Sequence, residues 1–91
     1  MKYEVKRTAQ FKKDYKAMAK RGMKLSELND IIELLANGMK LPAKNYDHAL
    51  TGNYSGFREC HIAPDWLLIY LVTEDALILT LTRTGSHSDL F

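Results

Sequence analysis

His48, His61 and His87 are the three histidines of this 91-residue chain, and none of them falls in a segment with helical periodicity. Imidazoles change charge near neutral pH, so they are suited to accepting and donating protons. Asp65, four residues after His61, supplies a carboxylate that can orient an imidazole, and Arg83 supplies a guanidinium that can neutralise a phosphate. Acid, base and cation are therefore all present.

Cleavage of RNA by internal transfer requires this combination of groups. The ribose 2′-hydroxyl loses a proton as it attacks the phosphorus, and the 5′-oxygen gains a proton as it leaves. Negative charge gathers on the phosphate oxygens between these two events, where a cation stabilises it. No metal and no other cofactor is needed, so the residues predict a metal-independent ribonuclease.

Each residue also has a simpler interpretation. A single histidine is more often a hydrogen-bonded surface or core residue than a catalyst. Asp65 follows Pro64 and fits an ordinary turn, while Arg83 can simply pair with Asp89 or Glu59. It is the complete set, rather than any one member, that favours catalysis.

Two other kinds of chemistry are disfavoured by the spacing. Three histidines and an aspartate can bind zinc, but the sequence has no short paired-ligand motif and no His-x₃-His on a helix. Cys60 is a weak candidate nucleophile, because it alternates with His61 along a predicted strand and is expected to be buried and inert.

Two aromatic residues remain to be assigned. Trp66 opens an apolar segment and is expected to pack in the core. Phe91 ends a polar tail, where it can either stack on an RNA base or dock the tail onto the sheet. The sequence leaves these two roles for Phe91 open.

Length and composition predict a single domain over residues 1–91. The hydrophobic fraction of 46% and the charged fraction of 26% are ordinary for a globular protein. One cysteine cannot form an internal disulfide, which favours a reducing, cytoplasmic setting. The N-terminus lacks the apolar run of a signal peptide, and no segment is long enough to span a bilayer, so neither export nor membrane insertion is expected.

Charge is divided unevenly along the chain. Residues 1–40 contain ten Lys and Arg against five Asp and Glu, whereas residues 41–91 contain three against six. This asymmetry predicts a basic face that binds a polyanion, although a solvated lysine-rich helix would show the same pattern. The basic cluster consists of Lys12, Lys13, Lys16, Lys20 and Arg21.

Periodicity predicts the elements that position these residues. Residues 2–6 alternate as a strand, Thr8 is a candidate N-cap for a helix that ends near Gly22, and a second helix with an apolar stripe over 25–35 stops at Asn37-Gly38. The two helices are expected to form an antiparallel hairpin. A long loop follows over residues 39–56.

The remainder of the chain predicts an antiparallel meander with strands at 57–62, 66–72 and 76–84, followed by a tail at 85–91. The middle strand is apolar on both faces and belongs in the centre of the sheet, with the helices on one side. The predicted fold is a two-layer α+β domain of order β-α-α-β-β-β, a helical hairpin packed on an antiparallel sheet.

Several segments together resemble the YafQ branch of the RelE-type toxins in the RelE/ParE superfamily of type II toxin–antitoxin systems. The segments are DHALTG at 47–52, GFRECHI at 56–62, PDWLLIY at 64–70, RTGSH at 83–87 and the terminal Leu90-Phe91. Length, element order and the basic first helices also agree with this family, and the resemblance implies its RelE-like fold.

The resemblance implies a toxin that enters the ribosome and cuts messenger RNA, leaving a 2′,3′-cyclic phosphate and a 5′-hydroxyl. Matched by position, His48, His61, Asp65 and His87 correspond to the acid–base residues of the family, Arg83 to an arginine beside the tail, and Phe91 to an aromatic residue that places the RNA. We expect His87 to act as the acid, and His48 and His61, oriented by Asp65, to share the base role and bind the phosphate.

The resemblance also implies partners. A cognate antitoxin is expected to cover or remodel the active site, and the basic cluster is expected to contact ribosomal RNA through its phosphates. One alternative is a ParE-like toxin that binds DNA gyrase without cutting nucleic acid, but the three histidines and Phe91 argue against that branch. Another is a domain that only binds RNA or protein, with structural histidines.

Overall fold

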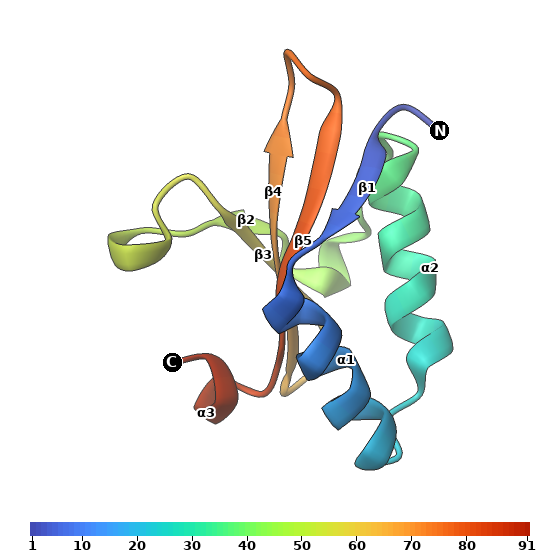
Figure 1. Ribbon diagram of the computed structural model, residues 1–91, viewed down its shortest axis with the longest axis vertical. Coiled ribbons are helices and arrows are strands. Elements are labelled where there is room, and N and C mark those ends of the chain that lie inside the picture. The colour runs from blue at the N-terminus through green and yellow to red at the C-terminus, as the bar shows by residue number, and fades with distance from the viewer.

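The computed structural model describes all 91 residues, which form one five-stranded sheet with helices packed against it (Figure 1). The strands lie in the order β1-β5-β4-β3-β2; β1 runs parallel to β5 and the other neighbours are antiparallel. This confirms the predicted α+β fold with the apolar 66–72 segment at the centre. The elements are β1 Glu4–Arg7, α1 Ala9–Lys20, α2 Leu25–Ala36, η1 Ala43–Asn45, β2 His48–Ala49, η2 Gly52–Tyr54, β3 Arg58–Ala63, β4 Trp66–Thr73, β5 Ile78–Gly85 and α3 His87–Leu90.

The two long helices begin and end where the sequence predicts. Thr8 caps α1, because its side chain accepts a hydrogen bond from the backbone nitrogen of Phe11 at 2.9 Å. Gly22 and Gly38 follow the ends of α1 and α2 with φ angles of 77° and 72°, a left-handed conformation that glycine adopts without strain. The helices run in opposite directions and diverge from the turn that joins them (Figure 1).

The sheet has an apolar residue layer on each face. The larger layer lies against α1 and α2 and includes Phe11, Leu28, Trp66 and Tyr70. The smaller one consists of Leu67, Ile69 and Leu90, with Leu50, Tyr54 and Phe57 packed around them. Because α1 and α2 cover only the first face, the second face is available for a site.

Two sequence predictions in the connecting segments were wrong. The 39–56 segment is not a continuous loop: it contains two short 3₁₀ helices and strand β2, in which His48 pairs with Glu59 and Ala49 with Arg58. A two-residue strand is too short to show a period, so this strand has no signal in the sequence. The last strand begins at Ile78 rather than 76, since Leu77 turns with a φ of 53°.

The C-terminal tail is also not a tail. Residues His87–Leu90 form helix α3, which begins with a capping box: Ser86 accepts from the backbone of Asp89, and the Asp89 side chain accepts from the backbone of Ser86. Leu90 is buried in the smaller apolar layer. The end of the chain is therefore fixed on the face opposite to α1 and α2.

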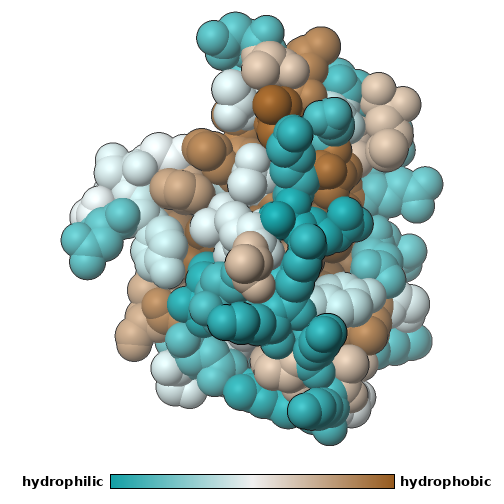
Figure 2. All heavy atoms as spheres, viewed as in Figure 1, coloured by the Kyte–Doolittle hydropathy of each residue, from teal (hydrophilic) through white to brown (hydrophobic).

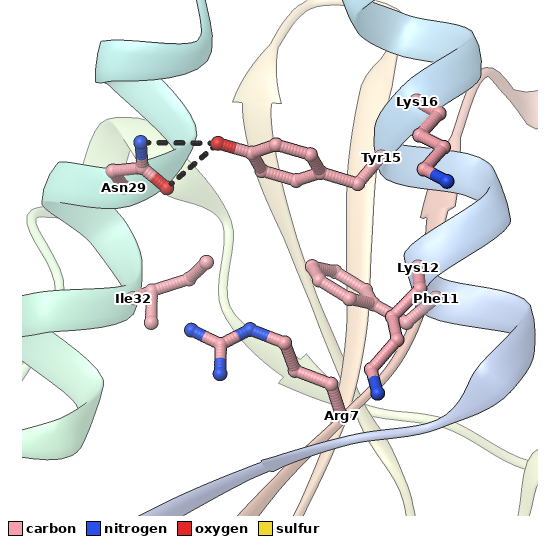
Figure 3. Close-up of a pocket in the computed structure, with 7 residues that line it drawn as sticks. All are labelled: Arg7, Phe11, Lys12, Tyr15, Lys16, Asn29 and Ile32. Carbon is pink, nitrogen blue, oxygen red and sulfur yellow. Dashed lines mark hydrogen bonds between the residues drawn. The ribbon is translucent and has the colours of Figure 1, made fainter.

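A cavity of about 430 Å³ lies between the diverging helices (Figure 3). Phe11 and Ile32 provide apolar walls, and Tyr15 and Asn29 exchange hydrogen bonds across one end. Hydrophilic residues cover much of the surface over α1 (Figure 2). No helix combines the length and apolar character needed to cross a bilayer.

Candidate active site

Strand register places the predicted residues on the open face of the sheet. His48 lies opposite Glu59, and residues directly opposite each other in an antiparallel pair share a face. Glu59 and His61 are two residues apart on β3, so they also share that face. His48 and His61 are thus diagonal neighbours on adjacent strands, and β2, which the sequence does not predict, is the element that brings them together.

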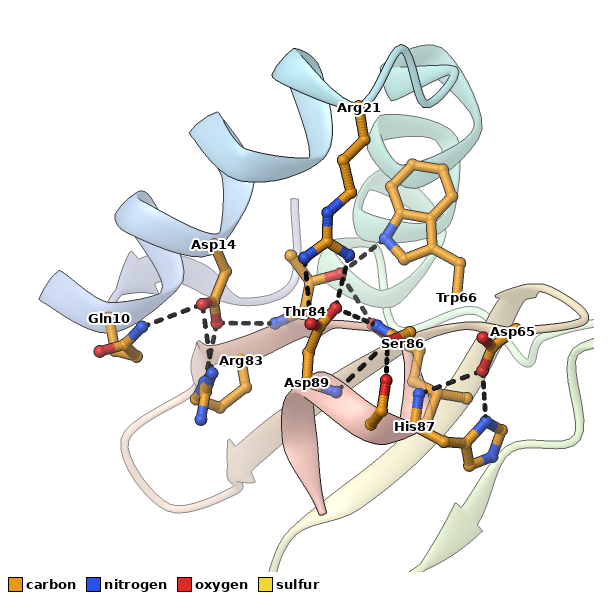
Figure 4. A network of polar contacts seen from close by, with 12 residues as sticks. Gln10, Asp14, Arg21, Asp65, Trp66, Arg83, Thr84, Ser86, His87 and Asp89 are labelled. Atoms are coloured by element: carbon orange, nitrogen blue, oxygen red, sulfur yellow. Dashed lines mark hydrogen bonds and ion pairs between the residues drawn. The ribbon is translucent and has the colours of Figure 1, made fainter.

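His87 and Asp65 form the best-defined pair in the site (Figure 4). The Nδ1 of His87 lies 2.7 Å from Oδ1 of Asp65, and the backbone nitrogen of His87 donates to the same oxygen at 3.1 Å. This hydrogen bond lowers the pKa of the Asp65 carboxyl. Because Nδ1 donates to the carboxylate, the opposite ring nitrogen, Nε2, is left for a substrate.

This pairing corrects the expectation that Asp65 orients His61 and His48. The Asp65 turn is adjacent to His61 in sequence, but α3 folds back and presents His87 to it. The ring of His61 instead lies edge-on between two other rings, with centroids 5.9 Å from that of His87 and 5.5 Å from that of Tyr46. His61 and His87 therefore form the centre of the site.

His48 lies at one side of this centre and contacts two acceptor groups. Its Nδ1 donates to the backbone carbonyl of Tyr46 at 2.6 Å, and its Nε2 lies 3.4 Å from Oε1 of Glu59. Glu59 is only 5% exposed, and its Oε2 has no hydrogen-bond partner in the protein. From the sequence, Glu59 is a candidate partner for Arg83 only, and its place beside His48 follows from the β2–β3 pairing, which has no local signal.

Arg83 lies at the other side of the site and is held by α1 rather than by Asp89 or Glu59. Its Nε donates to Oδ2 of Asp14 at 2.8 Å and its Nη2 to Oδ1 at 3.3 Å. The same carboxylate accepts the backbone nitrogen of Thr84 at 3.2 Å, where β5 extends beyond its last partner on β1. Asp14 thus takes the place of a neighbouring strand while it orients the arginine (Figure 4).

Arg21 does not belong with the four lysines of the basic cluster. At about 100° per residue, Lys12, Lys13, Lys16 and Lys20 share one side of α1, whereas Arg21 falls on a different side. Its guanidinium makes two hydrogen bonds to Asp89, at 2.6 and 3.0 Å. The cluster predicted to contact RNA therefore divides into four exposed lysines and one arginine that ties α1 to α3.

The Arg21–Asp89 pair predicts an acid-sensitive attachment of α3. Arg21 and the backbone of Ser86 hold the pKa of Asp89 far below its usual range. Since the folded-state pKa is depressed, this contribution to stability is present above the unfolded pKa of about 4 and is lost as the pH falls. We expect the free energy of unfolding to fall between about pH 5 and pH 2, and Asp89→Asn to be less stable at pH 7 with a shallower fall. Denaturant titrations across this range test it, and parallel curves for the two proteins would contradict it.

Phe91 is exposed at the end of the chain, and its neighbour Leu90 supplies the docking contact with the sheet. Leu90 docks α3 on the sheet, while the Phe91 ring remains 64% exposed. That ring meets Tyr54 edge-on at a centroid distance of 5.8 Å, and Tyr54 meets Phe57 in the same way at 6.0 Å. The sequence did not predict a site role for Tyr54. The only signal for its contact with Phe91 is an aromatic residue within a long polar segment.

The structure confirms the expected burial of Trp66 and Cys60. Trp66 is 1% exposed and its Nε1 donates to Oγ1 of Thr84 at 2.9 Å. Cys60 is fully buried, and burial raises the pKa of its thiol to about 12. No group of three or more histidine, cysteine, aspartate or glutamate side chains has an arrangement that could hold a metal ion.

Comparison with known proteins assigns nearly the full length of the chain to a known protein family. The family model described as a bacterial toxin of type II toxin–antitoxin system, YafQ, matches residues 3–91. The mRNA interferase toxin YafQ of Escherichia coli strain K12 is 38% identical over 89 residues, which are 97% of this chain and 95% of that protein.

Solved structures extend the similarity to the fold. The toxin in the crystal structure of the E. coli DinJ–YafQ toxin–antitoxin complex superposes with a TM-score of 0.90 at 37% identity, over 100% of this chain and 99% of that one. A metal-bound toxin from Helicobacter pylori superposes with a TM-score of 0.92 at 39% identity, over 98% of this chain and 99% of that one. The RelE-like architecture expected from the sequence is therefore confirmed.

Proposed function

The chain belongs to the YafQ family of bacterial toxins of type II toxin–antitoxin systems, and from that premise we propose that it is an endoribonuclease that cuts messenger RNA on the ribosome. The relative from E. coli is itself named an mRNA interferase. In this proposal the substrate phosphate lies on the open face of the sheet, over His61 and His87 and within reach of Arg83.

The observation that carries the proposal is the Asp65–His87 pair beside His61. A carboxylate that accepts a hydrogen bond from Nδ1 fixes both the orientation and the tautomer of an imidazole. Nε2 of His87 then faces the substrate and can exchange a proton with it. The neighbouring His61 ring has no hydrogen-bond partner in the protein and supplies a second proton-transfer group 5.9 Å away, centroid to centroid.

The mechanism follows from these groups. His61 accepts the proton of the ribose 2′-hydroxyl as that oxygen attacks the phosphorus. His87 acts in its doubly protonated form: Nδ1 keeps its proton on Asp65, and Nε2 donates its proton to the departing 5′-oxygen. Arg83 and His48 lie on either side and stabilise the negative charge that develops on the phosphate oxygens. The bond from phosphorus to the 5′-oxygen breaks, and the products are a 2′,3′-cyclic phosphate and a 5′-hydroxyl.

Two macromolecular partners belong to the proposal. A cognate antitoxin is expected because an unrestrained nuclease of messenger RNA would arrest the cell, and the E. coli relative is crystallised with one, DinJ. The four exposed lysines of α1 supply positive charge for ribosomal RNA, on a different side of the helix from Asp14 and Arg21. Phosphate contacts of this kind position a protein without selecting sequence.

The lysine face gives a prediction that is separate from catalysis. Replacing Lys13 and Lys20 with glutamine is expected to weaken ribosome binding and to reduce the slope of log affinity against log salt by about two, because about one counterion is released for each phosphate contact. Pelleting assays over a salt series measure this slope. Lys24→Gln removes an exposed charge outside α1 and is the matched control. Equal slopes for all three proteins would contradict the proposed face.

The proposed function is tested by expressing the chain in bacteria without an antitoxin and mapping the 5′ ends of messenger RNA. We expect growth arrest and cuts in phase with codons for the unmodified chain, and neither for His87→Ala. Growth arrest that persists in a variant with alanine at His48, His61 and His87 would overturn the nuclease and favour a toxin that acts by binding, such as the gyrase-directed ParE type.

A further inference from the structure

A second cavity, of about 490 Å³, lies directly beside the catalytic centre. His61 forms part of its wall, together with Tyr46 and Lys44 from the η1 segment and Pro64 from the β3–β4 turn. The mechanism assigns no role to this cavity. When a phosphate of an RNA strand contacts His61, the bases on either side of that phosphate lie nearby. The cavity adjoins His61 and is therefore in reach of one of these bases.

Tyr46 is the unusual residue of the cavity wall. Its side chain is 68% exposed, although a tyrosine ring has much apolar surface to bury. Its φ angle of 46° lies in the left-handed region, which is uncommon for a residue with a large side chain. Such conformations cost free energy and concentrate at functional sites, so this one calls for an explanation.

The surroundings of Tyr46 fix its position relative to two histidines. Its carbonyl accepts the hydrogen bond from Nδ1 of His48, and its ring meets the His61 ring edge-on at 5.5 Å. Asn45 is only 5% exposed, and its Nδ2 donates a hydrogen bond to the backbone carbonyl of His61 at 2.8 Å. This bond attaches η1 to β3. Tyr46 is therefore an exposed ring on a rigidly attached backbone.

We propose that Tyr46 and the cavity beside it form a subsite for one nucleobase of the RNA, next to the phosphate that His61 and His87 contact. Bases that have left a helical stack are bound in proteins by stacking on aromatic side chains, and every base offers such a face. Lys44 adds a cation at the same wall for the adjoining phosphate. The inference rests on the proposed function, and it assigns Tyr46 to substrate binding rather than to proton transfer.

With this subsite, aromatic rings lie on two sides of the histidines. Phe91 and Tyr54 form one aromatic platform, a pair of rings at the end of α3. Tyr46 forms the second platform, on the side of β2 and η1. The two platforms come from segments that are far apart in the sequence. A strand held at both places would present the phosphate between them to His61 and His87.

The test compares three variants in steady-state cleavage of a defined message in a reconstituted translation system. Tyr46→Asn removes the ring but suits the left-handed backbone that holds His48, and Tyr46→Phe keeps the ring. Leu77→Asn is the matched control, because Leu77 is also exposed with a positive φ but lies in the β4–β5 turn. Tyr46→Asn is expected to raise KM about 5- to 150-fold, the range measured for loss of one stacked base, with kcat little changed.

A fluorescence measurement reports the stacking itself. Messages with 2-aminopurine at successive positions around the cut are bound to the His87→Ala protein, so that no cleavage occurs. At one position the 2-aminopurine is expected to lose fluorescence on binding. The loss is expected to disappear when the His87→Ala protein also carries Tyr46→Asn. Unchanged KM and unchanged fluorescence in Tyr46→Asn would overturn the subsite while leaving the nuclease intact. If the unmodified chain cuts no message, the proposed function fails and the subsite fails with it.

Discussion

Replacing His87 with alanine is expected to lower the rate of RNA cleavage by about 10²- to 10⁴-fold, the usual contribution of a positioned general acid. The loss should appear in kcat, because His87 donates its proton only as the 5′-oxygen departs. The start of α3 stays attached in this variant, since the backbone nitrogen of His87 still donates to Asp65. Single-turnover cleavage of ribosome-bound message measures the effect directly.

The Asp65→Asn variant is the informative companion. An amide in place of the carboxylate accepts the Nδ1 proton less strongly and removes the negative charge that stabilises the doubly protonated ring. We expect a loss of activity that is large but smaller than that of His87→Ala, with the fold retained. A His87→Ala protein that cuts at the rate of the unmodified chain would refute the assignment of the acid.

Replacing Arg83 with alanine is expected to lower kcat by about 10²- to 10³-fold, as removal of one preorganised donor to a developing negative charge does. Asp14 accepts from Nε and Nη2 of the guanidinium, so we expect Nη1 to be the nitrogen that reaches the phosphate. The side chain is 25% exposed, so it is anchored on one edge and accessible on another. Single-turnover rates at saturating ribosome separate this effect from weaker binding.

Arg83→Lys separates charge from geometry. Lysine keeps the positive charge but cannot hold Asp14 with one edge of a planar group while it offers another edge to the phosphate, so a partial loss is expected. Asp14 keeps its hydrogen bonds from Gln10 and the backbone of Thr84, and thermal melting checks that both variants remain folded. Equal kcat for Arg83→Ala and the unmodified chain would exclude Arg83 from transition-state stabilisation.

The elements with strong local signals were predictable, and the contacts that assemble the site were not. Thr8, Gly22 and Gly38 mark helix ends through backbone chemistry that acts within a few residues, and the apolar run of 66–72 places β4. In contrast, β2 has only two residues and exists because β3 offers it an edge. Its pairing, which places His48 near His61, depends on partners nine and eleven residues away in the chain.

Helix α3 does have a local signal in the sequence. Ser86 and Asp89 have the spacing of a capping box, which identifies a helix start even in a short polar segment. A tail without this helix start does not predict the approach of His87 to Asp65. The angular positions on α1 likewise separate Arg21 from the lysines, but its partner Asp89 becomes visible only when α3 is in place.

The chemical ends of the cleaved RNA test the central claim most directly, because they record how the phosphate was attacked. Message cut by the unmodified chain in a purified translation system is examined by mass spectrometry. Attack by the 2′-hydroxyl between His61 and His87 predicts a 2′,3′-cyclic phosphate on one fragment and a 5′-hydroxyl on the other. Fragments that carry a 3′-hydroxyl and a 5′-phosphate would show that water attacked instead, and would contradict the account.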